Sequence, residues 1–261
     1  MKYCLSSRCS MKYLNQVDEI KVAWRDRESI LDVANQYPSA TIILECADDI
    51  LPYIEDIKNW NAGAAGRLIC CLRSLDRAGA LRENNINFYY GYLIDDFYAL
   101  QAVKNAGVCY VRLGANLFFQ MEMVKKIGVP VRVTPNIAYY AYLPFTSGTP
   151  GTWIRPEDIT RYEDKGYVAA VEFEDADTTK EEALFRIYAL GQGWGGPLNE
   201  MFTNFESNAR GCLIDDDFVE SRFNCAQRCM RDGSCHICYR TMRLADESLW
   251  ERVKANLEKD K

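Results

Sequence analysis

Short β-rich runs separated by helical patterns are the feature that most constrains the fold of this chain. Nine such runs follow one another, most of them about 20 residues apart, and this spacing is typical of the strand–helix units that form parallel sheets. The runs cover residues 1–7, 19–24, 41–46, 67–72, 87–92, 109–114, 130–136, 168–174 and 198–204. Several helical segments between them stop at glycine or proline, as helix ends commonly do. The pattern predicts an α/β fold.

The regular order of the runs favours a TIM-like (β/α)8 barrel over an open, doubly wound sheet. A length of 261 residues suits one such barrel, and no G-x-G-x-x-G turn marks a dinucleotide-binding sheet. We expect one barrel domain over 1–261, with a cysteine-rich metal-binding loop at 205–241 between the last strand and the last helix. Nine candidates are one too many for eight strands. Either the segment 67–84 is helical throughout, or the run 1–7 lies outside the barrel.

Two helix starts are marked by local signals. Pro156 stands at a plausible first helical position, where its missing N–H costs nothing. Thr179 and Glu182 have the spacing of a capping box, in which each side chain bonds the backbone N–H of the other.

Composition and charge narrow the range of partners. The chain is 48% apolar and 26% charged, as is ordinary for a globular protein. A net charge of −6 argues against extensive nucleic-acid binding, which needs a basic surface. No apolar run is long enough to span a membrane, and we identify no signal peptide. We therefore expect a cytoplasmic protein whose cysteines are reduced.

Charged residues recur on one alternating face of several predicted strands. In a barrel, alternate residues face the interior, and functional groups come from the carboxyl ends of the strands. Two interpretations are open: buried ion pairs, or a ligand site. In a ligand site, Arg112 and Arg132 would bind an anion. Glu172 or Glu174 would serve as the catalytic acid or base. The candidate substrate-binding residues are Arg112, Arg132, Asn136, Glu45, Tyr140 and Trp153.

The segment 137–154 is long and rich in tyrosine and glycine. Tyr140 and Trp153 could stack on a small or nucleotide-like substrate. Alternatively, the aromatic side chains cover the end of the barrel or form a surface for a protein partner.

Four cysteines near the end of the chain need a separate explanation. Cys225, Cys229, Cys235 and Cys238 lie in a polar segment, whereas Cys70, Cys71 and Cys109 lie in apolar runs typical of buried residues. Four thiolates suit a tetrahedral zinc site and equally an iron–sulfur cluster. Cys212 and His236, the single histidine, lie nearby but are not needed to complete such a site.

The stretch "NCAQRCMR" at 224–231 resembles the Cys-x-Gln-x-Cys-Arg stretch of the collagenase-like peptidase family. The opening "MKYCLSSRCSMKYLNQVDEIKV" also looks like that family's first strand–helix–strand unit. The resemblance implies a TIM-barrel-like domain, a [4Fe-4S] cluster and an oxygen-independent hydroxylation, as on tRNA, rRNA or ubiquinone precursors. Of the predicted ligands, only Cys225 and Cys229 match the motif, and the family's Cys-x6-Cys pair is absent. The chain is also similar to uncharacterised proteins encoded by phages and prophages.

Two functions therefore stand side by side. The first is an iron–sulfur enzyme that acts on a small or nucleotide-like anionic substrate. The second is a non-catalytic barrel with structural zinc that binds another protein, because a closed four-thiolate zinc site leaves no open coordination position.

Overall fold

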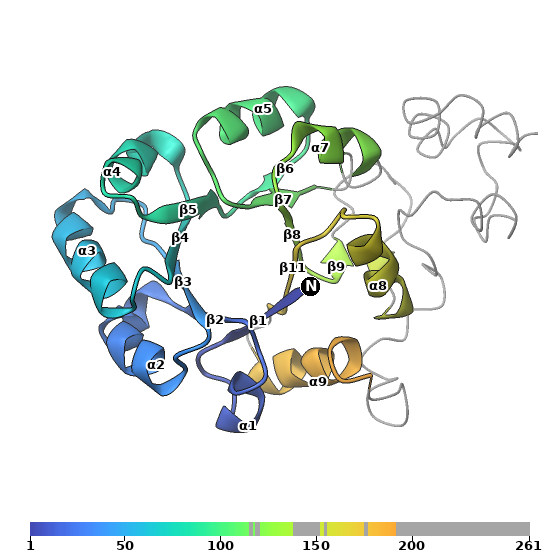
Figure 1. The fold of residues 1–261 in the computed structure, drawn as a ribbon, viewed down its shortest axis with the longest axis horizontal. Coiled ribbons are helices and arrows are strands. Elements are labelled where there is room, and N and C mark those ends of the chain that lie inside the picture. The colour runs from blue at the N-terminus through green and yellow to red at the C-terminus, as the bar shows by residue number, and fades with distance from the viewer. Residues whose placement is uncertain (115–116, 118–120, 138–151, 154–155, 175–176, 192–261) are drawn as a thin grey trace, which may run out of the picture.

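The computed structural model describes residues 1–114, 117, 121–137, 152–153, 156–174 and 177–191. Nine strands in these ranges form one sheet, in which each paired neighbour runs parallel. They are β1 (Lys2–Ser6), β2 (Glu19–Val22), β3 (Thr41–Glu45), β4 (Leu68–Leu72), β5 (Asn87–Tyr90), β6 (Leu93–Ile94), β7 (Val111–Leu113), β8 (Val131–Val133) and β11 (Ala170–Glu172). Their order is β5-β4-β3-β2-β1-β11-β8-β7-β6. The sheet curls into a half-barrel with helices outside it (Figure 1).

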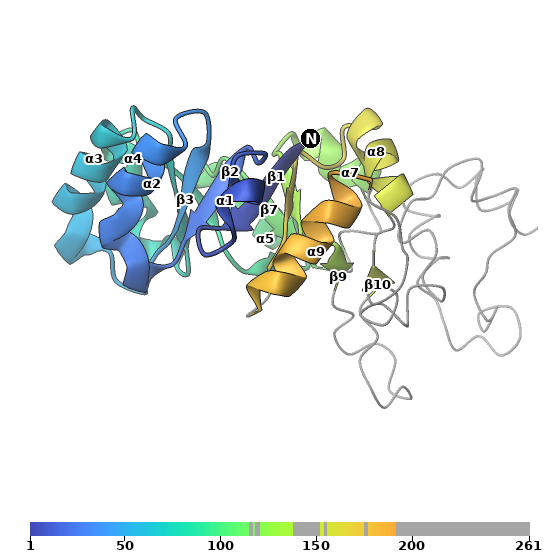
Figure 2. The same cartoon turned by 90° about the horizontal axis from the view of Figure 1, so that it is seen from below.

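Helices follow the strands in sequence and cover the outer side of the sheet, as the view turned by 90° also shows (Figure 2). They are α1 (Met11–Leu14), α2 (Ile30–Gln36), α3 (Ile54–Gly63), α4 (Ala78–Glu83), α5 (Phe97–Asn105), α7 (Met121–Ile127), α8 (Pro156–Asp164) and α9 (Thr178–Tyr188). Short 3-10 helices precede three of these: η1 (Trp24–Ser29), η2 (Leu51–Tyr53) and η3 (Leu75–Arg77). None of the described helices combines the length and the apolar character that crossing a bilayer requires.

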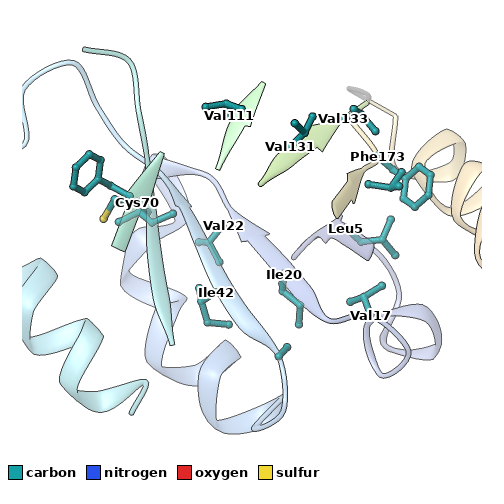
Figure 3. Packing of buried hydrophobic residues seen from close by; sticks show 14 of the residues in the cluster. Leu5, Val17, Ile20, Val22, Ile42, Cys70, Val111, Val131, Val133 and Phe173 are labelled. Atoms are coloured by element: carbon teal, nitrogen blue, oxygen red, sulfur yellow. The ribbon is translucent and has the colours of Figure 1, made fainter. Parts of the chain in front are cut away.

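The main hydrophobic core lies between the sheet and the helices. Ile20 of β2 and Ile42 of β3 are fully buried there, and both are directed toward the helical side of the strands (Figure 3). Because successive residues of a strand point to opposite faces, the residues between these apolar ones face the inside of the curl. The outer face of the sheet therefore packs against the helices, and the inner face can carry polar and charged side chains.

Eight of the nine predicted strands are confirmed, and the ninth, 198–204, lies outside the described residues. Both segments that were suspected of lying outside the sheet, 1–7 and 67–84, contribute a strand to it. Residues 68–72 form β4 before the chain turns helical, and β1 pairs with β2 on one side and with β11 on the other. Since both edges of β1 are occupied, the sheet has no place beside β1 for a further strand. The predicted cysteine-rich loop at 205–241 also lies outside the described residues.

The first residue of α8 is Pro156, as predicted. The predicted capping box at Thr179 is wrong, because α9 begins at Thr178, two residues before a helix capped by Thr179 would begin. Its N-cap is Asp177, whose carboxylate accepts a hydrogen bond from the Thr179 amide at 2.9 Å. Glu182 instead accepts from the Ser10 amide at 2.6 Å, in the loop after β1. That carboxylate joins α9 to the loop after β1 instead of capping its own helix.

The two ends of the strand order come close together in the chain. β5 and β6 are separated by only Gly91 and Tyr92, yet β5 pairs with β4 while β6 pairs with β7. The amide of Cys109, just before β7, donates to the Phe88 carbonyl of β5 at 2.9 Å. A separate antiparallel pair, β9 (Asn136–Ile137) and β10 (Thr152–Trp153), completes the described strands.

Candidate functional site

The inner face of the curled sheet carries buried charges. Glu19 and Lys21 of β2, Arg132 of β8 and Glu172 of β11 are all buried. A second, smaller apolar cluster lies beside them; its buried members are Cys4, Ile43, Ile69, Tyr89, Tyr110 and Ala170. Charges without water must be paired, and the side chains inside the curl supply each cation with carboxylates.

Arg132 lies at the centre of this interior. Its guanidinium forms ion pairs with Glu19 and, at 3.4 Å, with Glu172. It also lies over the rings of Tyr89 and Tyr110, at 5.1 and 4.9 Å from their centroids, where a cation is attracted to the aromatic face. Burial opposes the charge, but the surrounding carboxylates, with Glu172 the strongest, raise the arginine's pKa well above its usual value. We call Glu19, Arg132 and Glu172 the buried triad.

The amino-terminal end of the interior is closed by a second set of contacts. The Lys2 ammonium donates to the Tyr110 hydroxyl at 3.2 Å, and that hydroxyl donates to Glu19 at 3.0 Å. Lys2 also lies 3.7 Å from the Glu19 carboxylate. The half-exposed ammonium thus covers the triad from solvent at this end.

Lys21 connects the triad to the opposite, carboxyl end of the sheet. Its ammonium lies 2.8 Å from Glu172, 3.5 Å from Glu45 and 3.9 Å from Glu174. Burial opposes its charge, but these carboxylates raise the pKa of Lys21 above its ordinary value. Burial likewise opposes ionisation of Glu172, but Lys21, Arg132 and Arg112 hold its pKa well below the usual range. Both groups are therefore permanently charged at neutral pH.

Arg112 completes the carboxyl end. It donates to Glu174 at 3.0 Å and to the Gly91 carbonyl at 2.8 Å. Gly91 has no room for a side chain, because a Cβ there would lie 2.7 Å from the Cys71 sulfur. We call Lys21, Glu45, Glu174 and Arg112 the carboxyl-end cluster.

Solvent exposure divides the carboxyl-end cluster by charge. The side chains of Glu45 and Glu174 are 39% and 45% exposed, whereas those of Arg112 and Lys21 are 16% and 7% exposed. A molecule approaching this end meets two carboxylates before it meets a cation.

The structure brings five of the predicted site residues into this one network: Glu45, Arg112, Arg132, Glu172 and Glu174. For Arg132 the contacts are those of buried ion pairs, and its guanidinium is enclosed by its own carboxylates. Asn136 and Trp153 lie opposite each other in the β9–β10 pair. Tyr140 and the four cysteines from Cys225 to Cys238 lie outside the described residues.

Sequence reasoning missed Glu19, Lys21 and Lys2. The signal was present in "EIKV" at 19–22, where charged residues alternate with apolar ones just as they do around Arg112 and Arg132. Alternation alone would have placed Glu19 and Lys21 on the inner face.

The six described cysteines are free and belong to the packing of the sheet and its loops. Cys70 is fully buried, as predicted, while Cys71 and Cys109 are half-buried. Burial raises the pKa of the Cys71 thiol to about 11 and that of Cys109 to about 12, so neither is a reactive thiolate at neutral pH. Among the described residues, no group of three or more Cys, His, Asp or Glu side chains is arranged to hold a metal ion.

Comparison with known proteins adds little to this geometry. No family model matches the chain, and no curated protein matches it. Among solved structures it is similar to a cube-shaped, highly porous protein cage designed by fusing symmetric oligomeric domains. The identity is 12%, the TM-score is 0.42, and the match covers 98% of this chain and 97% of that one.

Proposed function

We propose that the sheet closes as a TIM-like (β/α)8 barrel and that the carboxyl-end cluster binds a small polar molecule. Two observations support closure. β5 and β6 belong to one short stretch of chain, and the Cys109 amide hydrogen-bonds to β5. Counted in this way, β5 and β6 are two parts of one strand, and eight strands each precede a helix. In barrels of this kind, ligands bind at the carboxyl ends of the strands.

One observation carries the binding proposal: two half-exposed carboxylates converge on a buried ammonium at that end. Glu45 and Glu174 would accept hydrogen bonds from the bound molecule, and Arg112 would donate to it. Of the two carboxylates predicted to be catalytic, Glu174 is the one exposed enough to touch a substrate. Glu172 holds Lys21 and Arg132 in place and so acts as a positioning residue.

Retention of small molecules by the immobilised protein tests this proposal. The protein is incubated with a protein-free cell extract, and the retained compounds are identified by mass spectrometry. We expect compounds that are retained by the native protein and lost from an Arg112→Gln/Glu174→Gln variant. A Glu55→Gln variant is the matched control, since Glu55 is an exposed carboxylate on α3 that pairs with Lys58. Identical retention by all three proteins would rule out a site at the carboxyl end.

We further propose that Cys225, Cys229, Cys235 and Cys238 hold one metal centre, either an iron–sulfur cluster or zinc. The contrast with the other cysteines supports this, because the described thiols are accounted for by packing, and burial raises the pKa of Cys4, Cys71 and Cys109. The four late cysteines lie in a polar segment that offers no such explanation. A cluster would give the chain the redox activity that the collagenase-like peptidase resemblance implies. Zinc bound by four thiolates would instead be structural.

Metal analysis after anaerobic purification distinguishes these cases. About four irons per chain with broad visible absorbance would identify a [4Fe-4S] cluster, and about one zinc without colour would identify a structural site. Cys225→Ser should lose the metal in either case. Cys71→Ser, a change of the same kind in the sheet, should retain it. Metal retained in full by Cys225→Ser would disprove this ligand set.

A further inference from the structure

An open cleft of about 550 Å³ lies beside the ends of β1 and β2, where the chain enters its first two loops. Its volume is in the range of small-molecule sites. The lining residues are Ser7, Arg8, Arg25, Asp26, Glu28 and Ser29. All six carry polar or charged side chains, so the cleft suits a polar ligand and not an apolar segment.

The six lining residues carry two cations and two carboxylates, and Arg27, next to them in the chain, adds a third cation. Arg25 lies 3.5 Å from the Asp26 carboxylate, and Glu28 lies 3.5 Å from the neighbouring Arg27. Arg8 is exposed, and no carboxylate of the described residues lies within ion-pair distance of it. After the pairs are set aside, one cation remains, and it belongs to Arg8.

The loop after β1 fixes the backbone amide and the Nε of Arg8. The Ser6 hydroxyl accepts from both the backbone amide and the Nε of Arg8, each at 3.4 Å. Ser6 is itself buried, and its amide donates to Glu181 at 3.2 Å. The next amide, that of Ser7, donates to the Lys21 carbonyl at 2.8 Å. These bonds leave the two terminal nitrogens of Arg8 for a ligand.

Of the two serines in the cleft, Ser7 is the better donor. The Ser29 hydroxyl already donates to the Asp26 carbonyl at 2.7 Å, so only its lone pairs face a ligand. An oxyanion would therefore be bound by the guanidinium of Arg8 and the hydroxyl of Ser7.

We propose that this cleft binds the carboxylate or phosphate group of a small polar molecule, with Arg8 as its anchor. Guanidinium matches either group with two parallel hydrogen bonds. The single surplus cation balances the charge of a carboxylate and part of the charge of a phosphate group, which is about −1.5 to −2 at pH 7. The cleft is larger than a bare ion needs, so the anionic group belongs to a larger molecule. The site does not depend on what the carboxyl-end cluster binds.

Titration with acetate and with inorganic phosphate tests the proposal. Ionic strength is held constant with sodium chloride, and binding is followed by NMR through the Nε–H signal of Arg8 and the amide signal of Ser7. We expect saturable shifts with at least one anion. Arg8→Gln should weaken binding at least about tenfold, the loss expected for a charge-assisted bidentate contact. Arg73→Gln is the matched control, since Arg73 is an exposed arginine outside the cleft that pairs with Asp48, and it should change affinity by less than about threefold.

Arg8-dependent binding of either anion supports the site, and the tighter of the two identifies the group that it recognises. Shifts that do not saturate, or that persist unchanged in Arg8→Gln, would overturn it. So would equal losses in the Arg8 and Arg73 variants, because the affinity would then reflect the general charge of the protein surface. Arg8 is exposed, so we expect both variants to unfold at the same temperature as the native protein.

Discussion

The buried triad and the carboxyl-end cluster are built from the same chemistry but differ in their access to water. In the triad, Arg132 and Glu172 are enclosed, and their partners face them from separate strands. In the cluster, Arg112 pairs with a carboxylate that is about half exposed. Removing one partner of an enclosed pair strands a charge without solvent, whereas water replaces a lost partner at the open end. The difference separates the end that holds the structure together from the end that is free to bind.

The largest effect should follow from removing the central cation. Arg132→Met leaves the carboxylates of Glu19 and Glu172 inside the sheet with only Lys2, Lys21 and Arg112 to offset them. We expect the free energy of unfolding, measured by urea titration, to fall by about 3–5 kcal/mol. Arg112→Met is the matched change at the open end and should cost about 1 kcal/mol or less. Equal losses would show that the two ends do not differ in the way proposed here.

The next largest effect concerns Glu172 and depends on pH. Glu172→Gln keeps the size but removes the charge between Lys21 and Arg132, and should cost about 1.5–3 kcal/mol at neutral pH. The pKa of Glu172 is lower in the folded protein than in the unfolded chain. Its contribution is therefore full above the unfolded pKa of about 4.3 and decreases as the pH falls below that value. The gap in unfolding free energy between native and variant should shrink below about pH 4, and a gap that stays constant would contradict the assignment.

A smaller effect tests how tightly the open end is packed. Gly91→Ala would place a Cβ 2.7 Å from the Cys71 sulfur and 3.4 Å from the Leu72 carbonyl, at an expected cost of about 1–3 kcal/mol. Adding Cys71→Ala removes the closer contact and should restore part of the loss. Thermal unfolding of the two single variants and the double variant measures this coupling. Strictly additive losses would mean that the two residues do not limit each other.

The smallest effect should come from the exposed carboxylates. Glu174→Gln and Glu45→Gln should each change the unfolding free energy by less than about 1 kcal/mol, as measured by urea titration beside Glu172→Gln. A loss as large as that of Glu172→Gln would place these carboxylates in the structural network and leave no free group for a ligand.

The strands could be predicted from the sequence because their apolar residues alternate and their spacing repeats. The same alternation identified Arg112, Arg132, Glu172 and Glu174, since a charged residue on an otherwise apolar strand is conspicuous. The sequence does not show which charged residues form ion pairs with each other. Lys21 meets a carboxylate 151 positions away, and Glu19 meets an arginine 113 positions away. These contacts depend on the curl of the sheet, which no local pattern encodes.

Local signals near α9 misled for a related reason. Thr179 and Glu182 satisfy the spacing of a capping box, but Asp177 is a better cap and stands two residues earlier. Glu182 is then free to bond the loop after β1, a contact made only once the first and last described elements are adjacent. The cap is thus decided locally by Asp177, and the tertiary contact with Ser10 decides what Glu182 does instead.

The pairing of β1 with β11 has a consequence for how the protein is made. A ribosome adds about 5–20 residues per second, so β1 waits roughly 10–30 s for its second neighbour to be synthesised. Throughout that time one edge of β1 is an open template for strands of other chains. The charged interior is incomplete for as long, because Arg132 has Glu19 available but not yet Glu172. The step that protects the edge is therefore the same step that completes the ion pairs, and β11 is the last of the described strands to be synthesised.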